Sequence, residues 1–278
     1  MRDSSARGSS DKIPAGYEQL RLRGTMLVGR REQIPALRAA LEGGTLYAYA
    51  AHHESARPLS GRGVAFAVPL PNGERVVVRH NRHGGLLAPL TGDRFVAPTR
   101  APYELAVSLR LTKCGVPTPE IVAYAVYDAG PLLRRSDVAS REVRDSVDLA
   151  AILTTEDAAK RRAALDATAT LISLLSACGA RHHDLNVKNV LLARAPSPTN
   201  SPSAPKAYVL DVDRVEFGRP GDSRVTERNL ARFVRSARKW RELYGARVDD
   251  GELARLAAAV RRLVGSTSSA GTRDSKRS

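Results

Sequence analysis

Cysteine is scarce in this chain of 278 residues, which has only Cys114 and Cys178. Two cysteines cannot build a disulfide framework or a four-cysteine zinc site. A core built from a chain of this length needs no such support. We therefore expect two reduced, buried thiols in a cytoplasmic protein.

Long apolar runs are missing as well. The longest stretch without charge lies between Asp166 and Arg181. It is shorter, and richer in Ser and Thr, than the roughly 20 apolar residues that span a bilayer. No charged segment followed by an apolar one opens the chain, so we expect no signal peptide. The sequence thus allows contact with a membrane surface, but not a crossing.

Lysine and aromatic residues are few, whereas arginine is abundant. Of the 44 basic residues only seven are Lys and 37 are Arg, and the net charge is +15. Arg suits bidentate contacts with phosphate or carboxylate, so the excess favours an anionic partner: a nucleotide, a nucleic acid or a lipid head group. The alternative explanation for the excess of Arg is a coding bias that favours this residue. Because aromatic residues make up only 5% of the chain, no stacking platform and no nucleic-acid partner are expected.

The sequence pattern predicts an α+β protein of two lobes between two tails. Ser, Gly and charged residues predict disordered tails at 1–15 and 265–278. Strand-like runs dominate 16–147, the N-lobe, and helical periodicity dominates 148–264, the C-lobe. The predicted strands are 45–50, 63–70, 75–80, 121–127, 132–143, 190–192 and 208–212. The predicted helices are 32–41, 103–113, 156–177, 226–244 and 252–264.

The strongest chemical signal is the run HHDLNVKNVLL at 182–192. It places Asp184 and Asn189 five positions apart, after a predicted helix and before an apolar strand. The next strand runs into Asp211. Carboxylate and amide oxygens suit Mg²⁺, and a carboxylate that is not bound to metal can orient a hydroxyl for attack on phosphorus. The pattern therefore predicts a metal–phosphate site, with a chance coincidence of these residues as the alternative.

This pattern resembles that of the protein-kinase-like phosphotransferases, H-x-D-x-x-x-x-N followed by an apolar strand that ends in Asp. More narrowly it resembles the bacterial lipopolysaccharide kinases, and among them the 3-deoxy-D-manno-octulosonic acid (Kdo) kinase branch. The resemblance implies that Asp184 is the catalytic base, that Asn189 and Asp211 are the Mg²⁺ ligands, and that His182 supports the loop. Asn186 departs from the protein-kinase pattern, which usually has Lys at this position.

The N-lobe carries a less complete nucleotide signal. Gly61 and Gly63 precede a predicted strand and are candidates to cover the phosphates of ATP, although such a pair is also typical of a plain turn. The run VRHNRHGG at 78–85 is similar to one in the Kdo-kinase branch. By this resemblance Arg79 is the phosphate-holding cation, and Glu104 in the next helix is its expected ion-pair partner. The alternative for Arg79 is a solvated strand end.

Helix 226–244 is predicted to be amphipathic. Its apolar stripe consists of Leu230, Phe233, Ala237, Trp240 and Tyr244, and its basic face of Arg228, Arg232, Arg235 and Lys239. The basic face is either solvated or turned to an anionic surface, which would be the phosphates of an acceptor or the head groups of a bilayer.

Together these features imply, by resemblance, transfer of the γ-phosphoryl of ATP, with Mg²⁺, to a hydroxyl of Kdo in Kdo–lipid A or a related anionic glycolipid. The reaction is expected at the cytoplasmic face of the inner membrane, and the resemblance points to the O-4 hydroxyl. One alternative is another kinase of the same fold with a protein or small-molecule acceptor. The segment 211–226 has no Ala-Pro-Glu anchor, which disfavours a protein kinase. The other alternative is a non-catalytic protein that binds nucleotide or nucleic acid.

Overall fold

The computed structural model describes residues 13–59, 65–81, 95–96, 99–130, 133–194 and 204–274. Its chain forms two compact units: Met1–Ser108 with Glu120–Glu142, and Leu109–Pro119 with Val143–Ser278. The predicted lobes meet between residues 147 and 148. The second unit begins a few residues earlier than that and also takes in the segment Leu109–Pro119.

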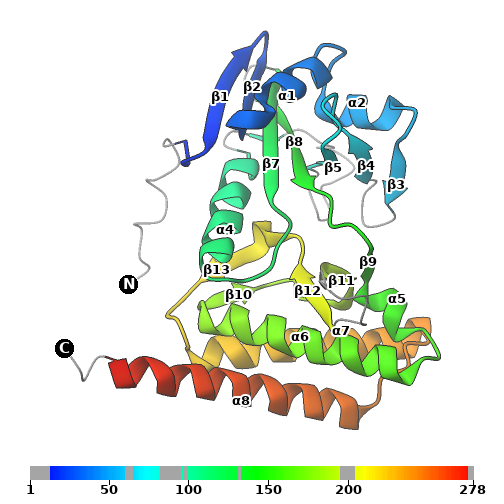
Figure 1. The fold of residues 1–278 in the computed structure, drawn as a ribbon, viewed down its shortest axis with the longest axis vertical. Helices are drawn as coiled ribbons and strands as arrows, with labels where there is room; N and C mark the ends of the chain where they lie inside the picture. The colour runs from blue at the N-terminus through cyan, green and yellow to red at the C-terminus, as the bar shows by residue number, and fades with distance from the viewer. Residues whose placement is uncertain are drawn as a thin grey trace. The chain divides into compact units, whose positions relative to one another are not determined.

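The first unit is built on one antiparallel sheet with the strand order β1-β2-β7-β8-β5-β4-β3, and β6 pairs with β8 (Figure 1). The strands are β1 (Tyr17–Leu22), β2 (Thr25–Arg30), β3 (Arg57–Leu59), β4 (Ala65–Pro69), β5 (Arg75–His80), β6 (Phe95–Val96), β7 (Ile121–Asp128) and β8 (Leu133–Arg141). The hairpin of β1 and β2 was not among the predicted strands.

Helices α1 (Ile34–Ala40) and α2 (Leu46–His52) pack against this sheet and form its core with the buried strand residues. Strand β5 alternates between the core and the other face of the sheet, because Val76 and Val78 are fully buried while Arg75, Val77 and Arg79 are only partly buried. Its turn from β4 is closed by hydrogen bonds from the N–H of Leu70 to the carbonyl of Glu74 and from the N–H of Gly73 to the carbonyl of Leu70, and Gly73 takes a positive φ of 84° that suits glycine. The predicted strand 75–80 is confirmed.

The prediction of a strand at 45–50 is wrong, because these residues belong to the helix α2. The first N–H groups of a helix have no partner within it and need acceptors elsewhere. Here they donate to the Thr45 side chain (3.0 Å), to the hydroxyl of Tyr127 (2.8 Å) and to the buried carboxylate of Asp137 (2.9 Å). Two of these acceptors come from strands far along the sequence, so the local pattern could not reveal them.

The second unit is mainly helical. Helix α6 (Ala158–Ala177) packs against α7 (Ser223–Tyr244) and α8 (Asp250–Asp274). The other elements are α5 (Leu149–Leu153), β9 (Ser146–Asp148), β10 (Ala180–His182), β11 (Val190–Arg194), β12 (Pro205–Val209), β13 (Val215–Phe217) and two short 3-10 helices, η3 (Val187–Asn189) and η4 (Val212–Arg214). Helix α4 (Ala101–Lys113) runs from the first unit into the second. The α+β class is thus confirmed.

The predicted helix 156–177 is confirmed in α6, whose N-cap is Asp157. Its predicted apolar face is buried: Leu165, Thr168, Ile172 and Leu175. This helix contains most of the longest uncharged stretch of the chain. Among the described residues, no helix combines the length and the apolar character that crossing a membrane requires.

Three predicted ends differ from the structure. Strand β12 stops at Val209, because Asp211 takes a left-handed conformation (φ 60°) that an extended strand cannot include. Helix α8 continues to Asp274, so most of the segment 265–278 is helical; its Gly and Ser lower helix propensity without blocking the helix, and it contains no Pro. In the N-terminal tail, residues 1–12 lie outside the described residues.

The expectation of two reduced thiols is not met, because Cys114 and Cys178 form a disulfide bond. Cys114 directly follows α4 and is exposed, whereas Cys178 is the buried C-cap of α6. The Cα atoms lie 5.8 Å apart although 64 residues separate the two positions in sequence. Such a pairing depends on the tertiary fold and has no local sequence signal.

Reduction of this disulfide is expected to lower the free energy of unfolding by about 4 kcal/mol, because the bond closes a loop of 64 residues in the unfolded chain. Urea unfolding of the protein with and without dithiothreitol measures this effect. The variant Cys114→Ser is the control, since its side chain is exposed: it should match the reduced protein and ignore the reductant. An unfolding midpoint of the unaltered protein that does not respond to reductant would mean that both thiols are free.

Candidate functional site

Two pairs of antiparallel strands in the second unit bring the segment 182–189 next to Asp211. Strand β10 pairs with β13, with His182 opposite Val215, and β11 pairs with β12, with Val190 opposite Val209. The backbone bonds continue beyond the second pair, since the N–H of Leu210 donates to the carbonyl of Asn189 (2.9 Å). Asn189 and Asp211 therefore lie at the same end of the β11–β12 pair, as their sequence positions predicted.

His182 fixes the backbone of this site from within. Its ring is 1% exposed; Nε2 donates to the carbonyl of Leu210 (2.9 Å), and Nδ1 accepts from the N–H of Asp184 (3.1 Å). A carbonyl can only accept and an N–H can only donate, so one tautomer with one proton satisfies both bonds. Burial lowers the pKa of His182, and the carboxylates of Asp211 and Asp184 oppose this more weakly. A neutral His182 thus joins the two halves of the site, which agrees with its expected supporting role.

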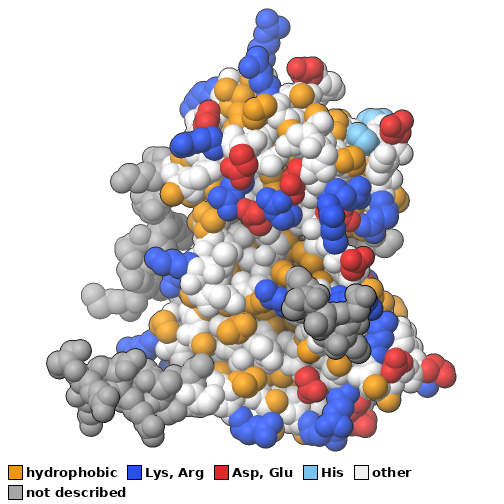
Figure 2. Space-filling model, viewed as in Figure 1, with side chains coloured by type: hydrophobic (Ala, Val, Ile, Leu, Met, Phe, Trp, Pro, Cys, Tyr) orange, Lys and Arg blue, Asp and Glu red, His pale blue; other side chains and the backbone are white. Residues whose placement is uncertain are grey.

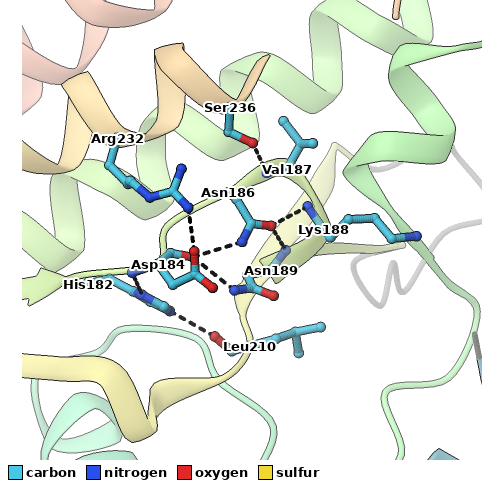
Figure 3. Close-up of polar contacts among 9 residues, drawn as sticks. All are labelled: His182, Asp184, Asn186, Val187, Lys188, Asn189, Leu210, Arg232 and Ser236. Atoms are coloured by element: carbon cyan, nitrogen blue, oxygen red, sulfur yellow. Dashed lines mark hydrogen bonds and ion pairs between the residues drawn. The ribbon is translucent and has the colours of Figure 1, made fainter. Parts of the chain in front are cut away.

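Asn186 and Asn189 fold the loop between β10 and β11 into a compact turn (Figure 3). The side-chain oxygen of Asn186 accepts from the N–H groups of Lys188 (2.9 Å) and Asn189 (3.1 Å), which caps the 3-10 helix η3. The side-chain NH₂ groups of both asparagines donate to the carbonyl of Asp184, at 3.1 and 2.9 Å. Because the NH₂ of Asn189 is engaged there, its amide oxygen lies on the side away from Asp184, where it is available as a ligand.

Two polar residues of α7 hold the same loop and were missed by the sequence analysis. Asn229 is fully buried; its side chain accepts from the N–H of His182 (3.0 Å) and donates to the carbonyl of Ala180 (2.9 Å). Ser236 accepts from the N–H of Val187 (3.3 Å). The sequence did contain a feature that indicates this role of Asn229. This residue falls beside Leu230 and Phe233 on the apolar side of an amphipathic helix, where a side-chain amide needs a hydrogen-bond partner.

The carboxylate of Asp184 lies where this loop meets α7. Asp184 is 6% exposed and forms an ion pair with Arg232 of α7 (Figure 3). Sequence analysis placed Arg232 on a basic face that is either solvated or turned to an anionic surface, and it did not predict this contact with Asp184. It is a charge-assisted hydrogen bond, of the kind that fixes the orientation of a carboxylate.

The remaining predictions for α7 hold in part. Leu230, Phe233 and Ala237 are buried as predicted, but Tyr244 is 57% exposed. The ring of Tyr244 lies 4.4 Å from that of Trp240, which is only partly buried. The apolar stripe therefore leaves the core near the end of the helix.

In the first unit, the predicted ion pair between Arg79 and Glu104 forms. Arg79 lies in β5 and also donates to the side chain of Asn81 (2.8 Å), whose NH₂ donates to Ser136 (3.2 Å). Glu104 lies in the first turn of α4 and is 4% exposed. Arg79 is thus held by its neighbours and is not a freely solvated strand end. Gly61 and Gly63 lie outside the described residues.

The sequence predicted Asn189 and Asp211 to be Mg²⁺ ligands. Among the described residues, no group of three or more His, Cys, Asp or Glu side chains is placed to hold a metal ion. One amide oxygen and one carboxylate are hard ligands of the kind Mg²⁺ prefers, and Mg²⁺ commonly takes only one or two protein ligands together with substrate phosphates. The pair therefore fits a Mg²⁺ ion that arrives with a nucleotide, and does not fit a permanently bound metal.

A buried Asp and a partly buried Asn on one loop, beside a strand-end Asp, are typical of a phosphotransferase. A model of the lipopolysaccharide kinase (Kdo/WaaP) family matches residues 51–256. The chain belongs to this family, and it is a kinase that uses ATP. A search of curated proteins gives no match. Among solved structures the chain is similar to WaaP in complex with acyl carrier protein, with 18% identity and a TM-score of 0.47, over 85% of this chain and 98% of that chain.

Proposed function

We propose that this kinase transfers the γ-phosphoryl of ATP to a hydroxyl of Kdo in Kdo–lipid A, the O-4 hydroxyl by resemblance, at the cytoplasmic face of the inner membrane. The observation that carries the proposal is the convergence of Asp184, Asn189 and Asp211 around the ends of two paired strands. Family membership supports a lipopolysaccharide acceptor over a protein or an antibiotic. Lipopolysaccharide intermediates are anionic, which agrees with the net charge of +15.

In this proposal Asp184 accepts the proton of the attacking hydroxyl. Its carboxylate is held by Arg232 and its backbone by His182, Asn186 and Asn189. A base with a fixed orientation meets the hydroxyl without first having to be ordered, which favours in-line attack on the γ-phosphorus. The electron pair of the O–H bond then forms the new P–O bond, and the bond from the γ-phosphorus to the bridging oxygen breaks to release ADP.

Asn189 and Asp211 would hold the Mg²⁺ that accompanies the triphosphate. A bound Mg²⁺ would neutralise charge on the phosphate oxygens. The left-handed backbone of Asp211 turns the chain sharply after β12 and presents the carboxylate at the strand end. In the first unit, Arg79 with Glu104 is proposed to hold the phosphates nearer the ribose, with Gly61 and Gly63 covering them.

The non-catalytic alternative, nucleic-acid binding, has less support. On the face drawn in Figure 2, the described Lys and Arg side chains are interspersed with Asp and Glu rather than gathered together. Several arginines are also neutralised by ion pairs, such as Arg141 with Glu120 and Arg261 with Glu227. On this face, charges interspersed in this way do not form a continuous track for a phosphate backbone.

The proposed acceptor is tested by incubating the purified chain with γ-labelled ATP and three substrates: Kdo–lipid A, lipid A without Kdo, and a generic protein. Label is expected in the first substrate alone. Label in lipid A without Kdo would move the acceptor hydroxyl to another sugar. Label in the protein would replace the proposal by a protein-kinase activity.

Replacement of Arg79 by alanine is expected to raise the KM for ATP about tenfold or more, because charge-assisted hydrogen bonds to phosphate are lost. The buried Glu104 would then lack its partner, so Arg79→Lys is the safer variant: it keeps the charge and should raise KM less. Arg75→Ala is the matched control, since Arg75 lies in the same strand and pairs with Glu142. Equal effects of Arg75→Ala and Arg79→Ala on KM would show that strand stability, not phosphate binding, is being measured.

A further inference from the structure

Helix α7 turns a polar face toward the catalytic loop. Asn229, Arg232 and Ser236, spaced three and four residues apart, contact His182, Asp184 and Val187 in that order along the helix. This spacing places the three side chains on one face. Figure 3 shows Arg232 reaching from α7 to Asp184, and Ser236 to Val187. The helix is therefore part of the site, and Arg232 is its charged contact.

The same helix carries the α7 cation row, which we define as Arg228, Arg232, Arg235 and Lys239. Steps of four, three and four residues place these side chains along one side of the helix, next to the face that contacts the loop. Arg232 belongs to both sets. The row therefore meets the site at Arg232, which contacts Asp184, and its other three members extend along the helix on either side of that residue.

Most of the charge of this row is not neutralised within the part of the chain that the structure describes. Arg228, Arg235 and Lys239 are exposed, and none of them forms an ion pair with another described residue. Elsewhere on α7, Arg238 and Arg241 both pair with Asp250. Like charges three or four residues apart on a helix repel each other weakly, and an anion bound along the row would relieve that repulsion.

We propose that the α7 cation row binds the anionic groups of the acceptor glycolipid, a sugar carboxylate or a phosphate, and so positions the acceptor hydroxyl beside Asp184. This inference rests on the proposed function, because it names how that acceptor is recognised. Arg232 commits one terminal nitrogen to Asp184 and has further N–H donors in its guanidinium, so one side chain can contact both the base and an acceptor anion. Arg suits this role because its planar fork binds carboxylate or phosphate bidentately.

The test replaces the outer members of the row and leaves Arg232 in place, since that residue touches Asp184. The row variant is Arg228→Gln, Arg235→Gln and Lys239→Gln. The control variant is Lys160→Gln, Arg255→Gln and Arg262→Gln, which removes the same number of exposed Arg and Lys side chains from α6 and α8. Both variants lose three positive charges, so a general effect of net charge is the same in the two.

Steady-state kinetics are measured with γ-labelled ATP and a delipidated, soluble Kdo oligosaccharide, with and without its phosphates. The row variant is expected to raise the KM for the phosphorylated acceptor about tenfold or more, with the KM for ATP unchanged. The control variant should match the unaltered protein. If the KM defect persists on the dephosphorylated acceptor, the row binds the carboxylate; if it disappears, the row binds phosphate.

Two results would overturn the inference while leaving the proposed function intact. One is transfer by the unaltered protein with no difference between the row and control variants in the KM for any acceptor. The other is weaker binding of the row variant to vesicles containing anionic lipid while its KM for the soluble acceptor stays normal, which would assign the row to the membrane surface. Failure of the unaltered protein to label any Kdo acceptor would instead reject the proposed function itself.

Discussion

Asp184→Ala is expected to lower turnover on the true acceptor by roughly a hundredfold or more, because positioned general bases commonly contribute factors of about 10² to 10⁴. The KM for ATP should change little, since the loop backbone that carries Asn189 is held by His182, Asn186 and Asn229 independently of the Asp184 side chain. Initial rates at saturating ATP, together with calorimetric titration of ATP, separate the two effects.

Asp184→Asn is the matched comparison for this prediction. It keeps the size of the side chain and can still accept from Arg232, but an amide cannot take the proton of the hydroxyl. Both variants should therefore lose turnover to a similar extent. A loss confined to Asp184→Ala would mean that the side chain acts through packing and the Arg232 contact, and near-normal turnover of both would remove Asp184 from the mechanism.

Asp211→Asn is expected to abolish Mg²⁺-dependent binding of ATP, because an anionic oxygen ligand is lost beside a triphosphate. Asparagine is the informative replacement, since it is among the few residues that tolerate the left-handed backbone observed at this position (φ 60°). The substitution thus removes the charge without straining the turn. Asn189→Ala should have a smaller effect, because a neutral amide contributes less to the binding of a cation.

The measurement is calorimetric titration of ATP in Mg²⁺ and again in EDTA. Asp213→Asn is the control, because Asp213 lies two residues further on in the same turn and is not a proposed ligand. The unaltered protein and the control should bind ATP more tightly in Mg²⁺ than in EDTA, and Asp211→Asn should not. Normal binding of Mg²⁺ with ATP by Asp211→Asn would show that the ligand assignment at the end of β12 is wrong.

The local sequence pattern predicted the strands and helices in which apolar residues recur at regular spacing. Strand β5 lies at its predicted position, and α6 differs only at its first turn. Prediction failed where partners from distant strands decide the conformation, as at α2, whose first N–H groups rely on Tyr127 and Asp137. The disulfide between Cys114 and Cys178 was missed for the same reason, since nothing near either residue marks its partner.

The candidate site likewise has one part that the sequence predicted and one part that it did not. The loop from His182 to Asn189 was identified because its residues are contiguous and their spacing is distinctive. Asn229, Ser236 and the contact of Arg232 with Asp184 were not, because they come from α7, some 40 to 50 residues further along the chain. Polar residues on an amphipathic helix show that partners exist without showing which ones. The sequence therefore predicted the candidate reacting groups, and the fold identified the residues that hold their loop.

The central claim is that the loop at 182–189 and Asp211 form a working phosphoryl-transfer site. The most direct measurement is transfer of the γ-phosphoryl from labelled ATP to purified Kdo–lipid A by the unaltered chain, in Mg²⁺ and in EDTA, with salt-dependent binding of single-stranded DNA measured in parallel. The account predicts label in the Kdo-containing lipid, in Mg²⁺ alone, with no salt-sensitive DNA binding. Label that stays in ATP while the chain binds DNA with a steep dependence on salt would contradict it.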